Sequence, residues 1–138
     1  MDSGQKYQVG QHVTYFEEPD IIYMKLIGAV AAAEGDELNR LHRDFGRGRD
    51  HVFLLFDLSD LEKIDPGVRK DAGATLKMIP MRGAAIYGAP MKAKVVAKLI
   101  LTAMNLFKSE HEKAPVQFVD DEAAARAFIA RRRREIGV

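Results

Sequence analysis

The stretch VFLLFD, residues 52–57, decides the fold of this chain. Every residue before the final aspartate is apolar, and valine and phenylalanine favour extended backbone, so the run predicts a strand. A nearly continuous apolar run is typical of a strand that is covered on both faces, as in parallel sheets with helices packed against them. We therefore expect Val52–Asp57 to be the centre of an α/β sheet.

Two strands and a helix are expected before this central strand. Residues 12–17 (HVTYFE) and 21–28 (IIYMKLIG) are rich in β-branched and aromatic side chains, and Glu18-Pro19-Asp20 between them has the chemistry of a turn, so they predict a β-hairpin. From Glu34 the apolar residues recur at helical spacing until a glycine-rich turn at 46–48, which predicts an amphipathic helix. Residues 1–11 are expected to be an N-terminal tail, and 12–138 a single domain.

After the central strand, helices and strands alternate. Asp65-Pro66 predicts a helix start, and Pro80 ends the apolar periodicity that follows. The next expected elements are a strand at 83–88, a long helix from Met91 to Lys108, a strand at 115–119 and a final helix capped by Asp120 or Asp121. Strands alternating with helices need crossover connections, so the order ββαβαβαβα predicts a mixed, mostly parallel sheet of about five strands with four helices.

Composition narrows the function classes. The 138 residues suit one domain, and 21 Lys+Arg against 20 Asp+Glu give a net charge of +1, which predicts no general affinity for nucleic acid. The chain has no cysteine, which excludes disulfides and thiolate chemistry. The longest apolar stretches contain lysine and are shorter than the ~20 residues that a membrane span needs. We expect a cytoplasmic protein without a transmembrane segment.

Two segments resemble a known family. VFLLFDLSDL at 52–61, followed by IDPGV at 64–68, resembles the strand and helix-opening loop of the bacterial SpoIIAA-like (STAS) proteins, which include anti-sigma factor antagonists. VQFVDDEAA at 116–124 is similar to the closing strand and alanine-rich helix of that group. The resemblance implies a STAS fold and a regulatory protein-interaction function. It is strongest to the divergent branch, whose fold is also compared with lipid-binding CRAL-TRIO domains.

One position departs from the signalling members. In those proteins the serine just before the loop glycine is phosphorylated, and the added charge disrupts docking. Here Pro66 stands before Gly67, and proline has no hydroxyl group. Ser59, one loop earlier, is a poor substitute. The resemblance therefore implies a binding domain that lacks this phosphorylation switch.

No catalytic set can be assembled from the sequence. Asp57, Asp60 and Asp65 follow the central strand and could bind Mg²⁺ or transfer protons, although aspartates in such places are commonly loop formers and helix caps. The four histidines show no zinc-binding spacing, and no serine lies in a G-x-S-x-G elbow; they are His12, His42, His51 and His111, with Ser3, Ser59 and Ser109. We predict that the protein is not an enzyme and uses neither a metal nor a cofactor.

The strand ends offer a candidate binding mouth. Gly88-Ala89-Pro90-Met91-Lys92 leads from a strand into a helix whose free N–H groups could accept an anion, although such segments are more often structural loops, since every strand–helix unit has such a terminus. In open α/β sheets, ligands gather at the carboxyl ends of strands, where the 57–65 segment would also lie. The candidate partner- or ligand-binding residues are Asp57, Ser59, Asp65, Pro66, Gly67, Gly88, Pro90 and Lys92. The alternative function is thus a small-ligand or lipid-binding domain.

The helix expected at Met91–Lys108 has more apolar positions than a single buried stripe needs. Several lysines accompany them, and Val95, Leu99 and Phe107 are among the apolar residues. Core packing, a homodimer or partner-protein contact, and lipid contact are the three interpretations. We expect a protein partner or a second copy of the chain, and a small anionic or lipid ligand is the alternative.

Overall fold

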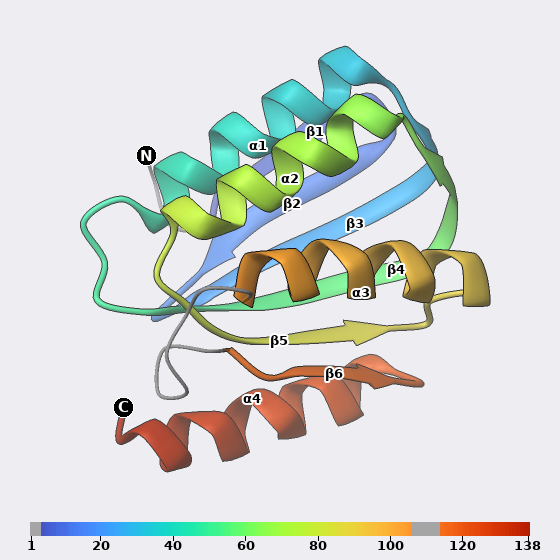
Figure 1. The fold of residues 1–138 in the computed structure, drawn as a ribbon. Coiled ribbons are helices and arrows are strands. Elements are labelled where there is room, and N and C mark those ends of the chain that lie inside the picture. Colours follow the sequence, from blue (N-terminus) through green and yellow to red (C-terminus); the bar gives the residue numbers. More distant parts are fainter. Residues whose placement is uncertain (1–3, 106–113) are drawn as a thin grey trace.

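The computed structural model describes residues 4–105 and 114–138, in which six strands alternate with four helices (Figure 1). In chain order the elements are β1 (Lys6–Val9), β2 (His12–Glu17), β3 (Ile21–Val30), α1 (Ala32–Gly46), β4 (Val52–Ile64), α2 (Pro66–Met78), β5 (Met81–Tyr87), α3 (Met91–Asn105), β6 (Val116–Val119) and α4 (Glu122–Ile136). The last expected residues of the third helix, Leu106, Phe107 and Lys108, lie outside the described residues, as does His111.

The strands form one mixed sheet in sequential order, β1-β2-β3-β4-β5-β6. β1, β2 and β3 pair antiparallel, whereas β3, β4, β5 and β6 pair parallel. Crossovers between parallel strands are right-handed, so three crossovers that step in the same direction place α1, α2 and α3 on one face (Figure 1). α4 follows the last strand and covers the opposite face. The predicted mixed, mostly parallel α/β sheet with four helices is confirmed.

The central strand is buried as VFLLFD predicted. Successive side chains of a strand point to opposite faces. Accordingly Val52 and Leu54 pack in the core beneath α1, α2 and α3, and Phe53 and Leu55 pack in the core beneath α4. All four side chains are almost completely removed from solvent. Because these side chains are buried on both faces of the strand, helices must cover both faces of the sheet.

The predicted N-terminal tail is wrong at Lys6–Val9, because these residues form β1, one strand more than the five expected. β1 pairs with β2 through a tight turn in which Gly10 has a φ of +61°. Left-handed backbone of this kind is readily adopted by glycine. β1 is an edge strand and mostly exposed, so its polar sequence carries no apolar alternation that would identify it.

The central strand is also longer than predicted, because β4 continues through residues 58–64, where apolar and polar side chains are mixed. Its second half pairs only with β3, since β5 ends at Tyr87 beside Asp57. This half of β4 is a sheet edge, where polar side chains reach solvent, and only Leu58 and Leu61 of it are buried. The sequence DLSDLEK therefore resembles a loop although the backbone stays extended.

The helix boundaries follow their predicted caps. Asp65 accepts a hydrogen bond from the backbone N–H of Gly67 at 2.9 Å, and Pro66 occupies the first turn of α2. Asp121 caps α4 by accepting from the N–H of Ala124 at 2.8 Å. Among the described helices, none has both the length and the apolar character needed to cross a bilayer.

Candidate functional site

Asp57 is the centre of a small polar cluster on β4. Its carboxylate accepts hydrogen bonds from the Ser59 backbone N–H at 3.0 Å and from the Ser59 hydroxyl at 2.6 Å. The Lys25 ammonium lies 3.4 Å from the carboxylates of both Asp57 and Asp60. Burial alone raises the pKa of Asp57, but the hydrogen bonds from Ser59 and the charge of Lys25 outweigh it and lower the pKa below its usual value. The Asp57 carboxylate thus has its hydrogen-bond and ion-pair partners within the cluster.

Gly88 lies directly against this cluster. It has a φ of +70°, and a Cβ atom added to it would lie 2.7 Å from the Cβ of Ser59. The close approach explains why glycine follows β5 here, because any larger residue would collide with β4. Pro90 follows and accepts the first backbone bond of α3, from Lys94 N–H, at 3.0 Å. Lys92, in the first turn of that helix, is exposed to solvent.

The remaining candidate residues lie elsewhere. Asp65, Pro66 and Gly67 follow the far end of β4, where the backbone N–H of Asp65 bonds to the carbonyl of Val30. Extended backbone rises about 3.3 Å per residue, so roughly 20 Å of strand separates Asp65 from Ser59. The structure therefore brings Asp57, Ser59 and Gly88 together, and it does not join them with Asp65–Gly67 in one mouth. A binding role for these residues stays a prediction.

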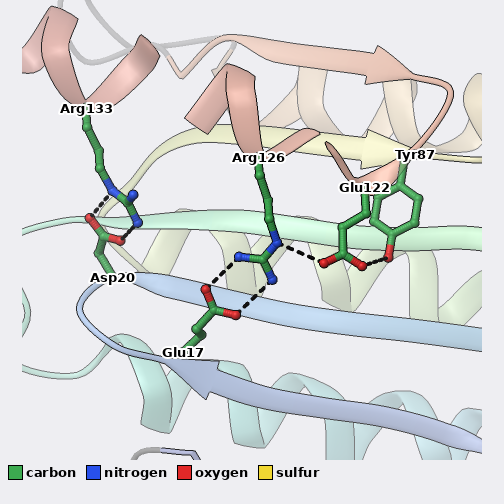
Figure 2. Close-up of polar contacts among 6 residues, drawn as sticks. All are labelled: Glu17, Asp20, Tyr87, Glu122, Arg126 and Arg133. Atoms are coloured by element: carbon green, nitrogen blue, oxygen red, sulfur yellow. Dashed lines mark hydrogen bonds and ion pairs between the residues drawn. The ribbon is translucent and has the colours of Figure 1, made fainter. Parts of the chain in front are cut away.

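A second polar network fastens α4 to the sheet (Figure 2). Arg126 makes a two-pronged pair with Glu17, at 2.7 and 2.9 Å, and a third bond to Glu122 at 2.8 Å. Tyr87 donates its hydroxyl to Glu122 at 3.1 Å. The hydrogen bonds from Arg126 lower the pKa of Glu17, and burial followed by the contact with Tyr23 raises the pKa of Tyr87. Each charged group has its partner, which indicates a structural clamp.

Asp20 completes the attachment of α4. Its buried carboxylate accepts hydrogen bonds from Arg133, at 2.5 and 3.1 Å, and His51 Nε2 lies 2.9 Å from it. Burial raises the pKa of Asp20, but the bonds from Arg133 and His51 reverse that effect and lower it. His12 is likewise internal, with Nδ1 accepting from the Ile27 N–H at 3.0 Å. Both histidines hold the fold, and within the described residues no group of acidic or histidine side chains has the arrangement of a metal site.

A cavity of about 100 Å³ lies between the sheet and helices α1, α2 and α3. Its walls are almost entirely apolar. They come from β3, β4 and β5 on the sheet side and from α1, α2 and α3 on the helix side, including Met24, Leu54, Phe56, Ile86, Leu38, Ala72, Leu76, Ala97 and Ile100. None of the predicted site residues lines it. The cavity thus lies beneath the helices, away from the loops at the strand ends.

Three polar side chains also line this cavity: Asn39 and His42 on α1, and Arg69 on α2. Asn39 Nδ2 and Arg69 Nε are shielded from solvent and have no hydrogen-bond partner in the part of the chain that is described. His42 is buried, with Nε2 3.0 Å from the Thr14 hydroxyl, and burial lowers its pKa to about 4. A neutral imidazole and two unpaired N–H donors are therefore the polar features of the cavity wall.

The sequence analysis missed Asn39 and Arg69. A signal existed for Asn39, which follows Gly35 by four residues and precedes His42 by three, so all three lie on the buried side of α1. A polar residue at a core-facing helical position marks either a buried hydrogen bond or a binding role. Arg69 gave no such signal, because an arginine in the first turns of an amphipathic helix is ordinarily solvated.

The comparisons with known proteins identify the fold. No family model and no curated protein matches the sequence. Among solved structures, an uncharacterised protein of the DUF3478 family with a SpoIIAA-like fold, from Shewanella loihica PV-4, superposes with a TM-score of 0.62 at 16% identity, covering 93% of this chain and 98% of that one. The anti-sigma factor antagonist SpoIIAA in its unphosphorylated form superposes with a TM-score of 0.56 at 7% identity, covering 85% and 95%. The chain has the SpoIIAA-like α/β fold.

Proposed function

We propose that this protein is a non-enzymatic regulatory domain that binds a partner protein through α3. The observation that carries the proposal is a row of exposed apolar side chains on that helix. Met91, Val95 and Leu99 are 74%, 51% and 65% exposed. Residues four apart lie above one another on a helix, so the three form a single stripe. Burying such a stripe against a partner gains about 25 cal/mol for each Å² of apolar surface.

The charges beside the stripe indicate the kind of partner. α3 carries Lys92, Lys94 and Lys98, and its sequence, MKAKVVAKLILTAMN, contains no acidic residue. A complementary partner surface has an apolar groove with carboxylates at its rim, because complementary charges at an interface favour the correct encounter and orientation. The SpoIIAA-like fold supports this choice, since one structure with that fold is an anti-sigma factor antagonist.

The polar residues near the strand ends support a non-enzymatic role. Ser59 donates its hydroxyl to Asp57, and Asp65 is occupied in capping α2. Pro66 occupies the start of α2 and offers no hydroxyl for phosphorylation. The proposed interaction is therefore not switched by a phosphate at this helix start.

Site-specific photocross-linking tests the proposal. A photoreactive phenylalanine analogue replaces Val95 or Leu99 in the living source cell, and the matched control replaces Glu135, an exposed residue of α4 on the other face of the sheet. We expect one discrete adduct from positions 95 and 99 and none from position 135. The adduct should weaken when Lys98→Glu reverses a charge beside the stripe.

Equal labelling at all three positions would contradict the proposal, and so would the absence of adducts. An adduct between two copies of the chain, with a dimer mass in light scattering, would replace the separate partner by a homodimer.

A second candidate function, small-ligand binding, is favoured by one specific observation, the cavity beneath α1, α2 and α3. This location differs from the strand-end loops to which the sequence pointed.

A further inference from the structure

The cavity beneath α1, α2 and α3 combines apolar walls with donors that lack acceptors. Its apolar walls exclude the water that would otherwise solvate a buried N–H group. Asn39 is only 7% exposed, and its Nδ2 atom has no partner among the described residues. An unpaired buried donor destabilises the fold, so an apolar side chain at this position would give a more stable protein. Asn39 thus points to a role other than packing.

Arg69 brings a positive charge to the same cavity. Its Nε is shielded from solvent and unpaired, and the ion pairs of the described residues include no acidic partner for its guanidinium. Asp65 caps the helix on which Arg69 lies, and neither Asp65 nor Asp71, two residues after Arg69, pairs with the Arg69 guanidinium within the described residues. A half-buried guanidinium without a counter-charge is an incomplete ion pair.

The helix packing brings Asn39 and Arg69 to one region. α1 and α2 run parallel, since Gly35 lies against Val68 near the start of both helices and Gly46 lies against Ile79 at the end of both. Arg43 bonds to the Thr75 hydroxyl at 3.2 Å between these points. Asn39 is one turn beyond Gly35 and Arg69 directly follows Val68, so both lie near the Gly35–Val68 contact of this seam.

We infer that this cavity binds a short aliphatic carboxylate, with its carboxylate held by Asn39 and Arg69 and its alkyl chain between the sheet and α2 and α3. Both protein groups are donors, so the ligand must supply acceptors, and the unpaired guanidinium selects an anion. A planar carboxylate matches the fork of a guanidinium. An engineered cavity of about 150 Å³ holds benzene, so the smaller cavity of about 100 Å³ here suits a short alkyl chain of about four or five carbons.

The test uses the intact protein and a set of defined probes. Acetate supplies the charge without the chain, hexanol the chain without the charge, and hexanoate both; hexyl phosphate presents the other common anion. Binding is measured by calorimetry and by NMR, in which the side-chain amide of Asn39 reports directly on the site. We expect hexanoate to bind at least about tenfold more tightly than acetate, hexanol or hexyl phosphate, a difference of about 1.4 kcal/mol. The Asn39 amide signals should shift with hexanoate.

Three variants separate the charge from the cavity. Arg69→Gln should weaken hexanoate binding about tenfold and leave hexanol unaffected, whereas the matched control Lys70→Gln, at the exposed neighbouring position on α2, should change neither. Ala97→Leu places a larger side chain in the α3 wall and should abolish binding of both probes while the protein keeps its native NMR dispersion.

The inference is overturned if hexanoate binds no more tightly than acetate or hexanol, because the carboxylate and the alkyl chain would then not act together. It is also overturned if hexyl phosphate binds best, or if Arg69→Gln and Lys70→Gln behave alike. Its outcome is independent of the cross-linking at Val95 and Leu99, so failure of the partner-protein proposal would leave this inference standing, and the reverse also holds.

Discussion

At the scale of single residues, His42 shows how burial controls the charge of a side chain. It stacks on Phe56, with ring centroids 5.9 Å apart, and its Nε2 makes a polar contact with the hydroxyl of Thr14. Desolvation lowers its pKa from 6.5 to about 4, so the folded protein keeps this imidazole neutral in mildly acidic solution. Since His42 lines the cavity, it adds no positive charge to the cavity at neutral pH.

We predict that His42 makes the protein less stable as the pH falls from about 6.5 to about 4. In that range the unfolded state takes up a proton that the folded state refuses, so its protonation favours unfolding. The effect is absent above pH 6.5 and complete near pH 4, where it reaches about 3 kcal/mol at 1.36 kcal/mol per pKa unit. Urea denaturation at pH 7, 6 and 5 measures it.

The matched variant for this prediction is His42→Gln, which cannot take up the proton. Its stability should fall less steeply than that of the wild type between pH 7 and pH 5, whatever its stability at pH 7. Equal slopes would show that His42 does not resist protonation. The carboxylates with lowered pKa values, such as Asp20 and Asp57, lose their contribution only below the usual carboxyl range, so they act outside this window.

At the scale of elements, α4 differs from the other helices in how it is attached. It covers its face of the sheet alone, with Phe128 and Ile129 in the core and Arg126 and Arg133 bonded to the β2–β3 end of the sheet (Figure 2). Bonds from two positions about two turns apart fix the direction of the helix as well as its contact. α4 lies on this face because it follows the last strand of the sheet. The ion pairs of Arg126 and Arg133 then fix the orientation of the helix across the strands.

We predict that Asp20→Asn destabilises the protein by about 2 kcal/mol, because it removes charged hydrogen bonds from a buried position while keeping the size of the side chain. The matched control is Glu37→Gln, which breaks the exposed pair with Arg40 on α1 and should destabilise the protein clearly less, because solvent screens this pair. Urea denaturation at neutral pH measures both. A loss for Asp20→Asn no larger than that of the control would contradict a structural role for the clamp.

At the scale of the whole molecule, the two faces of the sheet are packed differently. The face under α4 is closed by large apolar side chains such as Phe53 and Phe128. The opposite face contains the cavity, and among the described side chains of α3 only Ala93 is buried. Within the described residues, the helix that carries the exposed apolar stripe thus also has the fewest buried side chains.

We predict that this asymmetry appears as unequal local stability. Amide hydrogens in the described part of α3 should exchange at least about tenfold faster than those of Val52–Asp57 in β4, because local opening is easiest where few apolar contacts are broken. Hydrogen exchange followed by NMR measures this at neutral pH. Saturating hexanoate should slow exchange in α3 if the ligand sits beneath it. Equal protection of α3 and β4 would contradict the loose packing.

The sequence by itself determined the fold class. The VFLLFD run, the alternation of periods and the capping residues Asp65 and Asp121 are local signals, because strand burial, helical spacing and N-caps depend on residues close in the chain. The same signals did not predict β1 or the second half of β4. An edge strand needs no apolar pattern, so only its pairing with a neighbouring strand identifies it.

Only the tertiary structure decided which polar side chains lie together in a candidate binding site. The predicted mouth assumed that β4 ends near Asp57, and pairing with β3 carries the strand on to Ile64 and takes Asp65 away. The cavity arises because small residues meet between helices far apart in the sequence, and it brings together Asn39 and Arg69, whose polarity has meaning only beside its walls. The lack of an acceptor for these two donors results from three-dimensional packing, and no local sequence pattern reveals it.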